Sequence, residues 1–425
     1  MKRSLLVMAV IFAGMCAVPR VYAGPDTQVD ALIEKLVDKG ILSKDEADVL
    51  KGRAVADAKA AADAKTAADN IVKDPLPEWV HNTKLTGDFR IRNQYEHRIG
   101  STSSPNGRDR ARIRARLGVE TKVNDKFLMA VGIATDGGSA RSSNQTFDGS
   151  FAKGNVVLNY AYGQWTPNDR LTLTGGQMKN PVWEPMEFLW DADIALTGGA
   201  LEYNYKVNDA LTLTAMGGGF VIKELPLSNA DPYMLVGQLG GKGKLLGDKM
   251  DYRLAGTYQN VQNNTKTTFG SSANNTIASS QYTYRYNTPM ASAEIGLNDP
   301  LGGNFPFRVP RVALFGEYEK NPNPDDENTA WMAGMYMGNA KVAGKGAWKA
   351  TWAYKSIGRD AWLDVLPDSD FYGGNTDTKG YEAVLEYGLA KNVTIVVDYY
   401  HTQRKSSLAA PQQESLLQTD INLKF

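Results

Sequence analysis

The sequence predicts an all-β transmembrane barrel of about sixteen antiparallel strands, preceded by a short α-helical or coiled-coil segment. Three observations carry this prediction: apolar and polar residues alternate along many short segments, tight turns rich in Asn, Asp and Gly recur, and long polar segments separate the hairpins. The mean hydropathy of -0.37 and the hydrophobic share of 42% would also suit a soluble protein. A barrel has the same averages, because each strand carries one lipid-facing side and one wet side.

Residues 1–23 have the features of a secretory signal: a basic start, the apolar run LLVMAVIFAGMCAV and the small-residue site VYA. We predict cleavage after Ala23. A membrane anchor is the alternative, although the apolar run is short for a spanning helix. A lipid-modified Cys16 is disfavoured by the bulky Met15 before it. The only cysteine would leave with the signal, so no disulfide is expected.

The charge balance of the mature chain is close to neutral. Removing Lys2, Arg3 and Arg20 from the 47 basic residues leaves 44 against 47 acidic ones, a net charge of -3. This balance gives no reason to expect nucleic acid as a partner. No later stretch approaches 18 apolar residues, so a helical membrane protein is not expected.

Residues 24–77 have a helical pattern. Apolar residues repeat at helical spacing in TQVDALIEKLVDKG, Gly40 fits a C-terminal cap, and Ser43 to Glu46 (SKDE) form a capping box that begins a second helix. The following AVADAKAAADAKTAADNIV is a good helix former with little to bury. Two prolines in DPLPEWV end it. We expect a stalk or a weak self-association helix here, followed by a barrel over 78–425.

From Lys84 onward the hydrophobic period is two. In DRARIRARLGVETKV one face is apolar and the other carries four arginines. The same alternation recurs in KFLMAVGIA, LEYNYKV, YEAVLEYGL and VTIVVDYY, and in the final LLQTDINLKF, which ends on the aromatic Phe425. Each segment therefore predicts a membrane strand with one lipid-facing side.

Seven short turn signals give the strand count. They are VNDK at 123–126, PNDR at 167–170, VNDA at 207–210, LGDK at 246–249, LNDP at 297–300, VAGK at 342–345 and AKNV at 390–393. Seven turns join fourteen strands, and a first strand near 84–95 and a last near 414–425 make about sixteen. Both barrel ends then lie on the short-turn, periplasmic side, where residues 24–77 would also lie.

Several segments resemble the putative porin family of Gram-negative bacteria. They are TKLTGDFRIRNQYE, RARIRARLGVETKVNDK, YGQWTPNDRLTLTGGQMKNPVW and LWDADI, preceded by ALIEKLVDKGILSKDEADVL. The resemblance covers nearly the whole mature chain. It implies a barrel in the cell outer membrane, in contact with its lipid and similar to trimeric porins, through which small hydrophilic solutes or anions diffuse. The layout is also similar to phosphate-selective porins with an N-terminal coiled coil.

Six arginines on two adjacent strands are the candidate basic lining of the pore. They are Arg90, Arg92, Arg110, Arg112, Arg114 and Arg116. In lipid each would cost roughly 2 to 4 kcal/mol at the midplane, so we expect them to face the lumen. Acids such as Asp88, Glu120 and Asp251 could neutralise them, leaving only a wet lumen. Alternatively, the stripe stays positive and attracts anions.

The third long loop, MKNPVWEPMEFLWDADIAL at 178–196, is the richest in large apolar residues, which predicts that it is buried. Its acids are Glu184, Glu187, Asp191 and Asp193. In general sixteen-stranded porins the third loop folds into the barrel, and by that resemblance we expect these acids to face the arginines and narrow the pore. The alternative is that the loop packs on a neighbouring subunit or caps the outer rim.

No enzyme, metal or cofactor is expected. The histidines His81, His97 and His401 are far apart, with no second ligand at metal spacing. The sequence has no nucleophile elbow, P-loop or dinucleotide fingerprint, and 366–382 departs from the spacing of a calcium loop. The rivals to a porin are an outer-membrane anchor, whose N-terminal helices hold peptidoglycan or a periplasmic partner, and a secreted soluble β protein.

Overall fold

The computed structural model describes residues 33, 35–53, 56, 59, 78–99, 107–270, 274–302, 308–406 and 412–425. The chain divides into two compact units, Met1–Pro77 and Glu78–Phe425. The predicted signal over 1–23 and most of the Ala-rich stretch lie outside the described residues.

The first unit contains the two local helix signals expected from the sequence. Gly40 has a φ of 66° after the first helical residues, a conformation that glycine adopts without strain. At the next helix, the Ser43 backbone N–H donates to Glu46 Oε2 (2.9 Å), and the Glu46 N–H donates to Ser43 Oγ (3.3 Å). This reciprocal pair is a capping box. In the part of the chain described, none of the helices is both long and apolar enough for a membrane crossing.

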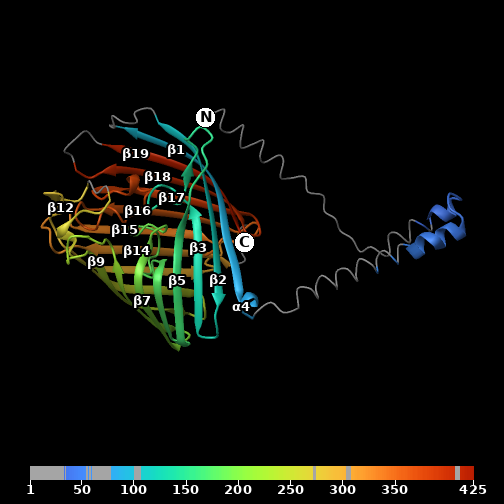
Figure 1. The fold of residues 1–425 in the computed structure, drawn as a ribbon, viewed down its shortest axis with the longest axis horizontal. Helices are drawn as coiled ribbons and strands as arrows, with labels where there is room; N and C mark the ends of the chain where they lie inside the picture. Colours follow the sequence, from blue (N-terminus) through green and yellow to red (C-terminus); the bar gives the residue numbers. More distant parts are fainter. Residues whose placement is uncertain are drawn as a thin grey trace. The chain divides into compact units, whose positions relative to one another are not determined.

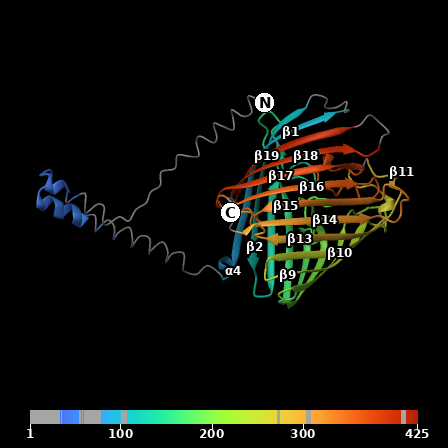
Figure 2. The ribbon, with the colours of Figure 1, turned by 180° about the vertical axis from the view of Figure 1, so that it is seen from behind.

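The second unit is a closed antiparallel β-barrel, which confirms the predicted fold class (Figure 1). Within the described residues it has sixteen long strands, and a two-residue strand, β4 (Gln145–Thr146), lies beside β2. The barrel closes because its first long strand pairs with both the second and the last. Figure 2 shows the wall from β9 to β16 from behind.

The long strands are β1 (Thr83–Ile99), β2 (Arg108–Lys122), β3 (Phe127–Thr135), β5 (Val156–Asn168), β6 (Leu171–Lys179), β7 (Ala195–Asn208), β8 (Leu211–Val221), β9 (Tyr233–Leu245), β10 (Met250–Gln262), β13 (Tyr286–Asn298), β14 (Arg311–Lys320), β15 (Thr329–Gly338), β16 (Trp348–Ile357), β17 (Thr378–Ala390), β18 (Val393–Arg404) and β19 (Gln413–Lys424). The short elements are the helix α4 (Glu78–His81), the 3-10 turns η1 (Asn264–Lys266) and η3 (Tyr372–Gly374), and the hairpin of β11 (Ile277–Ala278) and β12 (Gln281–Tyr282).

The alternation in the sequence becomes an inner and an outer face. On β19, Leu417 is 39% exposed on the outside whereas the next residue, Gln418, is 1% exposed. The last residue continues this strand, because the Phe425 N–H donates to Gly87 O (3.0 Å) and the Gly87 N–H donates to Phe425 O (3.1 Å). The outer face is therefore apolar and the inner face polar, as a membrane barrel requires.

All seven predicted turns lie between consecutive strands at one rim of the barrel. At the first, Asn124 Oδ1 accepts the N–H groups of Lys126 and Phe127, both at 3.0 Å. Such a side-chain bond tightens a hairpin without extra residues. Longer loops connect the strands at the opposite rim, among them 136–144, 180–194 and 358–377.

These longer loops provide the buried apolar core. Phe188, Leu189 and Trp190 of the 180–194 loop and Trp362 and Leu363 of the 358–377 loop are each no more than 3% exposed. They pack in one cluster with inward-facing strand residues. The loops therefore fold into the barrel and fill part of its lumen.

Candidate functional site

The six arginines form one stripe on the inner face of β1 and β2. In the antiparallel register Arg92 lies directly opposite Arg112, and Arg90 lies directly opposite Arg114. Like charges in opposed positions destabilise a sheet. The arginine stripe therefore depends on counter-charges from elsewhere in the barrel.

Two acids on β1 supply part of this charge. Asp88 bonds with Arg114 Nη2 (3.0 Å) and with Arg116 Nε (2.7 Å), and Glu96 bonds with Arg110 Nη2 (2.8 Å). Asp88 was among the neutralising acids expected from the sequence.

The two other acids expected to neutralise the stripe do not do so. Asp251 instead accepts Arg311 Nε at 3.0 Å on a different wall. Glu120 makes no ion pair with the arginine stripe within the described part of the barrel.

A third acid, which the sequence analysis missed, comes from the last strand. Asp420 on β19 lies opposite Arg92 in the register. Arg92 donates from Nε to Asp420 Oδ1 (2.8 Å) and from Nη2 to Asp420 Oδ2 (2.9 Å), a two-pronged contact. Arg90 Nε lies 3.2 Å from the same carboxylate. The closure of any barrel by its first and last strands was the signal that could have identified Asp420.

Two loops also reach the arginine stripe. Asp193 of the 180–194 loop bonds with Arg116 Nη1 at 3.2 Å, and Asp370 of the 358–377 loop bonds with Arg92 Nη1 at 3.2 Å. Asp193 also accepts the backbone N–H of Ser143 at 3.0 Å. The loops are thus tied to the wall by polar contacts at two points.

The other three acids of the 180–194 loop lie away from the arginine stripe. Asp191 accepts the N–H of Ser369 (2.9 Å). The backbone oxygen of Glu187 accepts Lys355 Nζ (2.8 Å), and Glu184 lies near the β14 carboxylate Glu317. Hydrogen bonding to the 358–377 loop and to β16 places this part of the loop beside the wall of β14 to β16. Of the four acids, Asp193 alone contacts the stripe among the described residues.

The part of the wall formed by β14, β16 and β17 is rich in carboxylates. Lys355 on β16 is completely buried and lies 3.1 Å from Asp368, with a further ion pair to Glu382. Glu187, Asp191 and Asp368 each bring an oxygen within 4.8 Å of the others. The carboxylates of Asp191 and Asp368 already accept hydrogen bonds from Ser369 and Lys355. We therefore assign no metal ion to this group.

Burial changes the acidity of this loop. Removal of Asp191 from water, and then the nearby Asp368 carboxylate, raise the pKa of Asp191 to about 7. Its side chain is 4% exposed, in agreement with this cause. The charge of the 180–194 loop therefore changes near neutral pH.

The 180–194 and 358–377 loops act as one packed body. The Trp190 and Trp362 rings meet edge to face, with centroids 5.7 Å apart, and Trp362 Nε1 donates to Leu189 O at 3.1 Å. Two backbone bonds also cross between the loops: Asp191 N–H to Leu366 O (2.8 Å) and Asp368 N–H to Phe188 O (3.1 Å). The inward folding of 358–377 was not foreseen, because its polar composition resembles that of an exposed loop.

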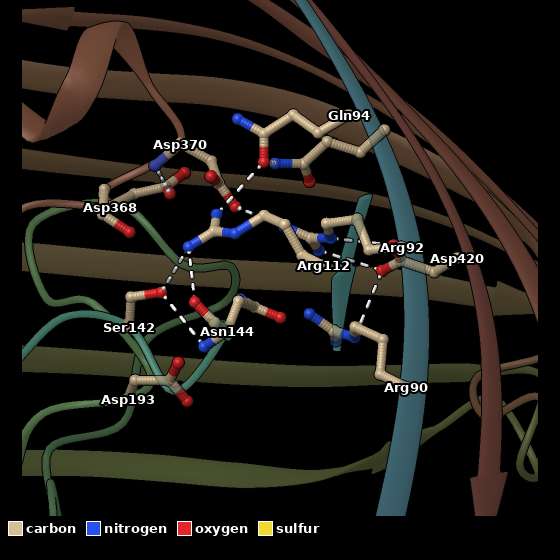
Figure 3. A network of polar contacts seen from close by, with 12 residues as sticks. Arg90, Arg92, Gln94, Arg112, Ser142, Asn144, Asp193, Asp368, Asp370 and Asp420 are labelled. Carbon is tan, nitrogen blue, oxygen red and sulfur yellow. Dashed lines mark hydrogen bonds and ion pairs between the residues drawn. The ribbon is translucent and has the colours of Figure 1, made fainter. Parts of the chain in front are cut away.

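Arg112 differs from the rest of the arginine stripe (Figure 3). It donates from Nη1 to Gln94 Oε1 (3.1 Å), and from Nη2 to Ser142 Oγ (3.3 Å) and Asn144 O (2.7 Å). All three acceptors are neutral, and sequence reasoning identified none of them. Among the described residues no carboxylate lies within 4.0 Å of Arg112, whereas each of the other five arginines has at least one.

Comparisons with known proteins agree with the barrel. A family model described as "Putative porin" matches residues 100–303 and 305–425, well over half of the chain. No curated protein matches the chain.

Solved structures give weaker likenesses. OprB of Pseudomonas putida, at high pH, has a TM-score of 0.54 and 10% identity over 82% of this chain and 96% of its own. An anion-selective porin from Comamonas acidovorans has a TM-score of 0.47 and 12% identity, over 81% of this chain and 99% of its own. The outer-membrane channel DcaP of Acinetobacter baumannii has a TM-score of 0.43 and 11% identity, over 81% of this chain and 98% of its own. Of these three, the likeness to OprB exceeds 0.5, and it shows a shared fold.

Proposed function

The chain belongs to the putative porin family and is an outer-membrane porin, and from that premise we propose that solutes pass between the arginine stripe and the two inward-folded loops. Small hydrophilic solutes and ions would diffuse passively through this charged constriction. The observation that carries the proposal is that each loop touches the arginine stripe, through Arg116–Asp193 and Arg92–Asp370 at 3.2 Å each, so that the passage is narrowed to the space beside these two contacts.

A preference for anions is the second part of the proposal. Five carboxylates, Asp88, Glu96, Asp193, Asp370 and Asp420, pair with the six arginines, so the arginine stripe keeps one positive charge in excess. A fixed positive charge at a narrow point attracts anions and repels cations. Glu184, Glu187 and Asp191 would then hold the 180–194 loop and set the charge on the side of the constriction away from the arginine stripe.

The arrangement of the chain in the cell envelope is proposed on the same premise. We propose a signal over 1–23, a periplasmic helical segment over 24–77 and a barrel over 78–425, assembled as a homotrimer. The start of β1 lies at the rim of the short turns, where Lys122 N–H donates to Asn82 O at 3.2 Å, which supports a periplasmic entry. Size measurement in detergent of known micelle mass would test the trimer.

The family and the fold indicate a channel rather than an enzyme. We propose no catalytic residue, cofactor or metal for the chain. The anchor role considered from the N-terminal helices gains no support from the family match, which lies entirely within the barrel.

Conductance in a planar bilayer tests the proposed function. The purified full chain should give ion-conducting steps, and a salt gradient should give a reversal potential on the anion side. Arg112→Glu with Arg114→Glu should move that potential toward cations, because two positive charges of the arginine stripe become negative. A protein that inserts without conducting steps would contradict the porin proposal, and an unmoved potential would place the stripe outside the constriction.

A further inference from the structure

A polar cavity separate from the arginine stripe lies at the rim of the long loops. It is found where the ends of β1 and β18 and the start of β19 meet the 358–377 loop. Arg98, Arg404, Tyr372, Asn375 and Gln412 are among its lining residues. Its volume is about 120 Å³. A cavity needs roughly 10 to 15 Å³ to hold one water, so this one has room for a small solute.

The cavity presents free guanidinium donors. Arg98 and Arg404 are its charged lining residues in the described part of the barrel, and no carboxylate lines it there. Both arginines meet their acids through Nε: Arg98 bonds with Glu414 in this way, and Arg404 donates to Asp377 Oδ2 at 3.1 Å. Arg98 Nε also lies 2.9 Å from Glu96. Among the described residues the Nη groups of both arginines make no hydrogen bond, and the two side chains are 38% and 34% exposed. Their outer N–H donors are therefore available to a ligand.

The charge beside the cavity is unbalanced by one. Apart from the acids already counted with the arginine stripe, Arg98 pairs with Glu414, and Arg404 and Arg359 both contact Asp377. Three arginines thus share two carboxylates. No charged residue occurs in the barrel segments outside the described residues, which are 100–106, 271–273, 303–307 and 407–411. A ligand that balances the excess carries one negative charge.

The neutral groups of the cavity are turned mainly as donors. Gln412 Oε1 accepts the Tyr372 hydroxyl at 3.1 Å, and Asn375 Oδ1 accepts Asn274 Nδ2 at 2.6 Å. Because its amide oxygen is occupied, Gln412 offers its Nε2 hydrogens to the cavity. A ligand with its own hydroxyl hydrogen would find no carboxylate among these lining residues to accept it, and an unpaired buried donor is costly.

Two guanidinium groups on different strands favour a head group with more than two oxygens. A planar carboxylate fills one guanidinium fork, whereas a tetrahedral head group can present oxygens to Arg98 and Arg404 together. A sulfonate has three acceptor oxygens, one negative charge and no hydroxyl hydrogen. Inorganic phosphate has the same shape but keeps at least one hydroxyl hydrogen at neutral pH. The sulfonate therefore meets the charge, the shape and the donor pattern at once.

We propose that this cavity is a saturable binding site for small organic sulfonates, held by Arg98, Arg404 and Gln412. The inference rests on the proposed function for its biological setting, because the site would bind a solute at the mouth of the barrel, away from the constriction. The binding itself requires only the folded barrel, so it can be measured without conduction.

The test uses thermal unfolding of the detergent-solubilised full chain, followed by heat-modifiable migration on a gel. Sodium methanesulfonate replaces sodium chloride at constant ionic strength. A ligand that binds the folded state raises the unfolding midpoint in a saturable way. The rise due to the site is the difference between the wild type and Arg404→Gln in the same salt. We expect this difference to be saturable with methanesulfonate and smaller with sodium acetate and sodium phosphate.

Two further variants control for salt effects and for folding. Arg308→Gln deletes the same charge at an arginine whose side chain is 77% exposed, and it should respond as the wild type does. Gln412→Glu keeps an acceptor for the Tyr372 hydroxyl and places a negative charge in the cavity, so its response to methanesulfonate should be lost. This variant provides the test if Arg404→Gln does not fold.

Three results would overturn the site: a wild type that does not respond to methanesulfonate, a response in Arg404→Gln or Gln412→Glu equal to that of the wild type, or a difference with phosphate as large as that with methanesulfonate. Conducting steps together with any of these would leave the porin function standing without the sulfonate site. Methanesulfonate binding in a protein that never conducts would uphold the site and contradict the proposed function.

Discussion

At the scale of single residues, two cations inside the barrel are held in opposite ways. Lys355 is fully buried and has Asp368 at 3.1 Å with Glu382 beside it. Arg112 has only neutral acceptors in the described structure. Breaking a buried pair costs about 3 to 5 kcal/mol, so the first arrangement fixes the wall that holds the loops. The second holds the Arg112 guanidinium through neutral groups, without a direct ion pair among the described residues.

Asp191 links this residue-scale chemistry to pH. Its pKa in the fold, about 7, lies above its ordinary value of 3.8. The folded state therefore favours the protonated acid, and its contribution to stability falls as pH rises from about 4 to about 7. Above that range the 180–194 loop carries an additional negative charge.

We expect the reversal potential in a salt gradient to move toward cations between about pH 5 and about pH 8 because of this charge. The movement should be smaller in Asp191→Asn, which cannot ionise. Glu187 and Asp368 also have raised pKa values, mainly from burial, and account for the part that remains. A full-sized movement in Asp191→Asn would assign the effect to other groups.

At the scale of elements, the 180–194 and 358–377 loops provide a packed apolar core inside the barrel. The Trp190–Trp362 contact, the Trp362 bond to Leu189 O and the two backbone bonds between them make one unit from segments far apart in the sequence. The 136–144 loop joins it, because Arg141 Nη1 donates to Gly374 O (2.6 Å) and Pro367 O (3.2 Å). A constriction built in this way keeps its width only while the loops stay packed.

Trp362→Ala tests this dependence. Removing a fully buried tryptophan costs about 3 to 5 kcal/mol, and the cavity would free both loops from one another. We expect larger and noisier single-channel conductance with the barrel still folded. Trp165→Ala is the matched control, since that ring is 42% exposed on the outer face and should leave conductance unchanged. Equal conductance in wild type and Trp362→Ala would show that these loops do not set the pore width.

At the scale of the whole molecule, the strand count and the short turns could be predicted because period-two alternation and Asn-Asp turns are local signals. Asn124 and its hairpin lie where the sequence placed them. The charge pairing depends on long-range register instead. Asp420 and Asp370 are 328 and 278 residues from Arg92, and nothing local marks either as its partner. Composition also failed to predict the inward folding of 358–377, because this segment is polar on average although its Trp362 is buried.

Asp420→Asn is the variant that tests closure of the barrel. It would leave Arg90 and the two-pronged donors of Arg92 without their carboxylate, at a cost of about 3 to 5 kcal/mol. The unfolding temperature on a heat-modifiability gel should fall clearly. Asp209→Asn, which loses an exposed pair with Lys206, should leave it within error of the wild type. Identical temperatures for the two variants would show that the seam pair is dispensable.

The ion pairs between β1 and β19 therefore favour one register of barrel closure over the others. The first two long strands carry arginines, and part of their neutralisation comes from the last strand, at Asp420. A slip of one residue would turn that carboxylate outward to lipid and leave two guanidinium groups unmatched. The correct register is thus the one in which Arg90 and Arg92 meet the Asp420 carboxylate, and a misaligned closure would lose these ion pairs.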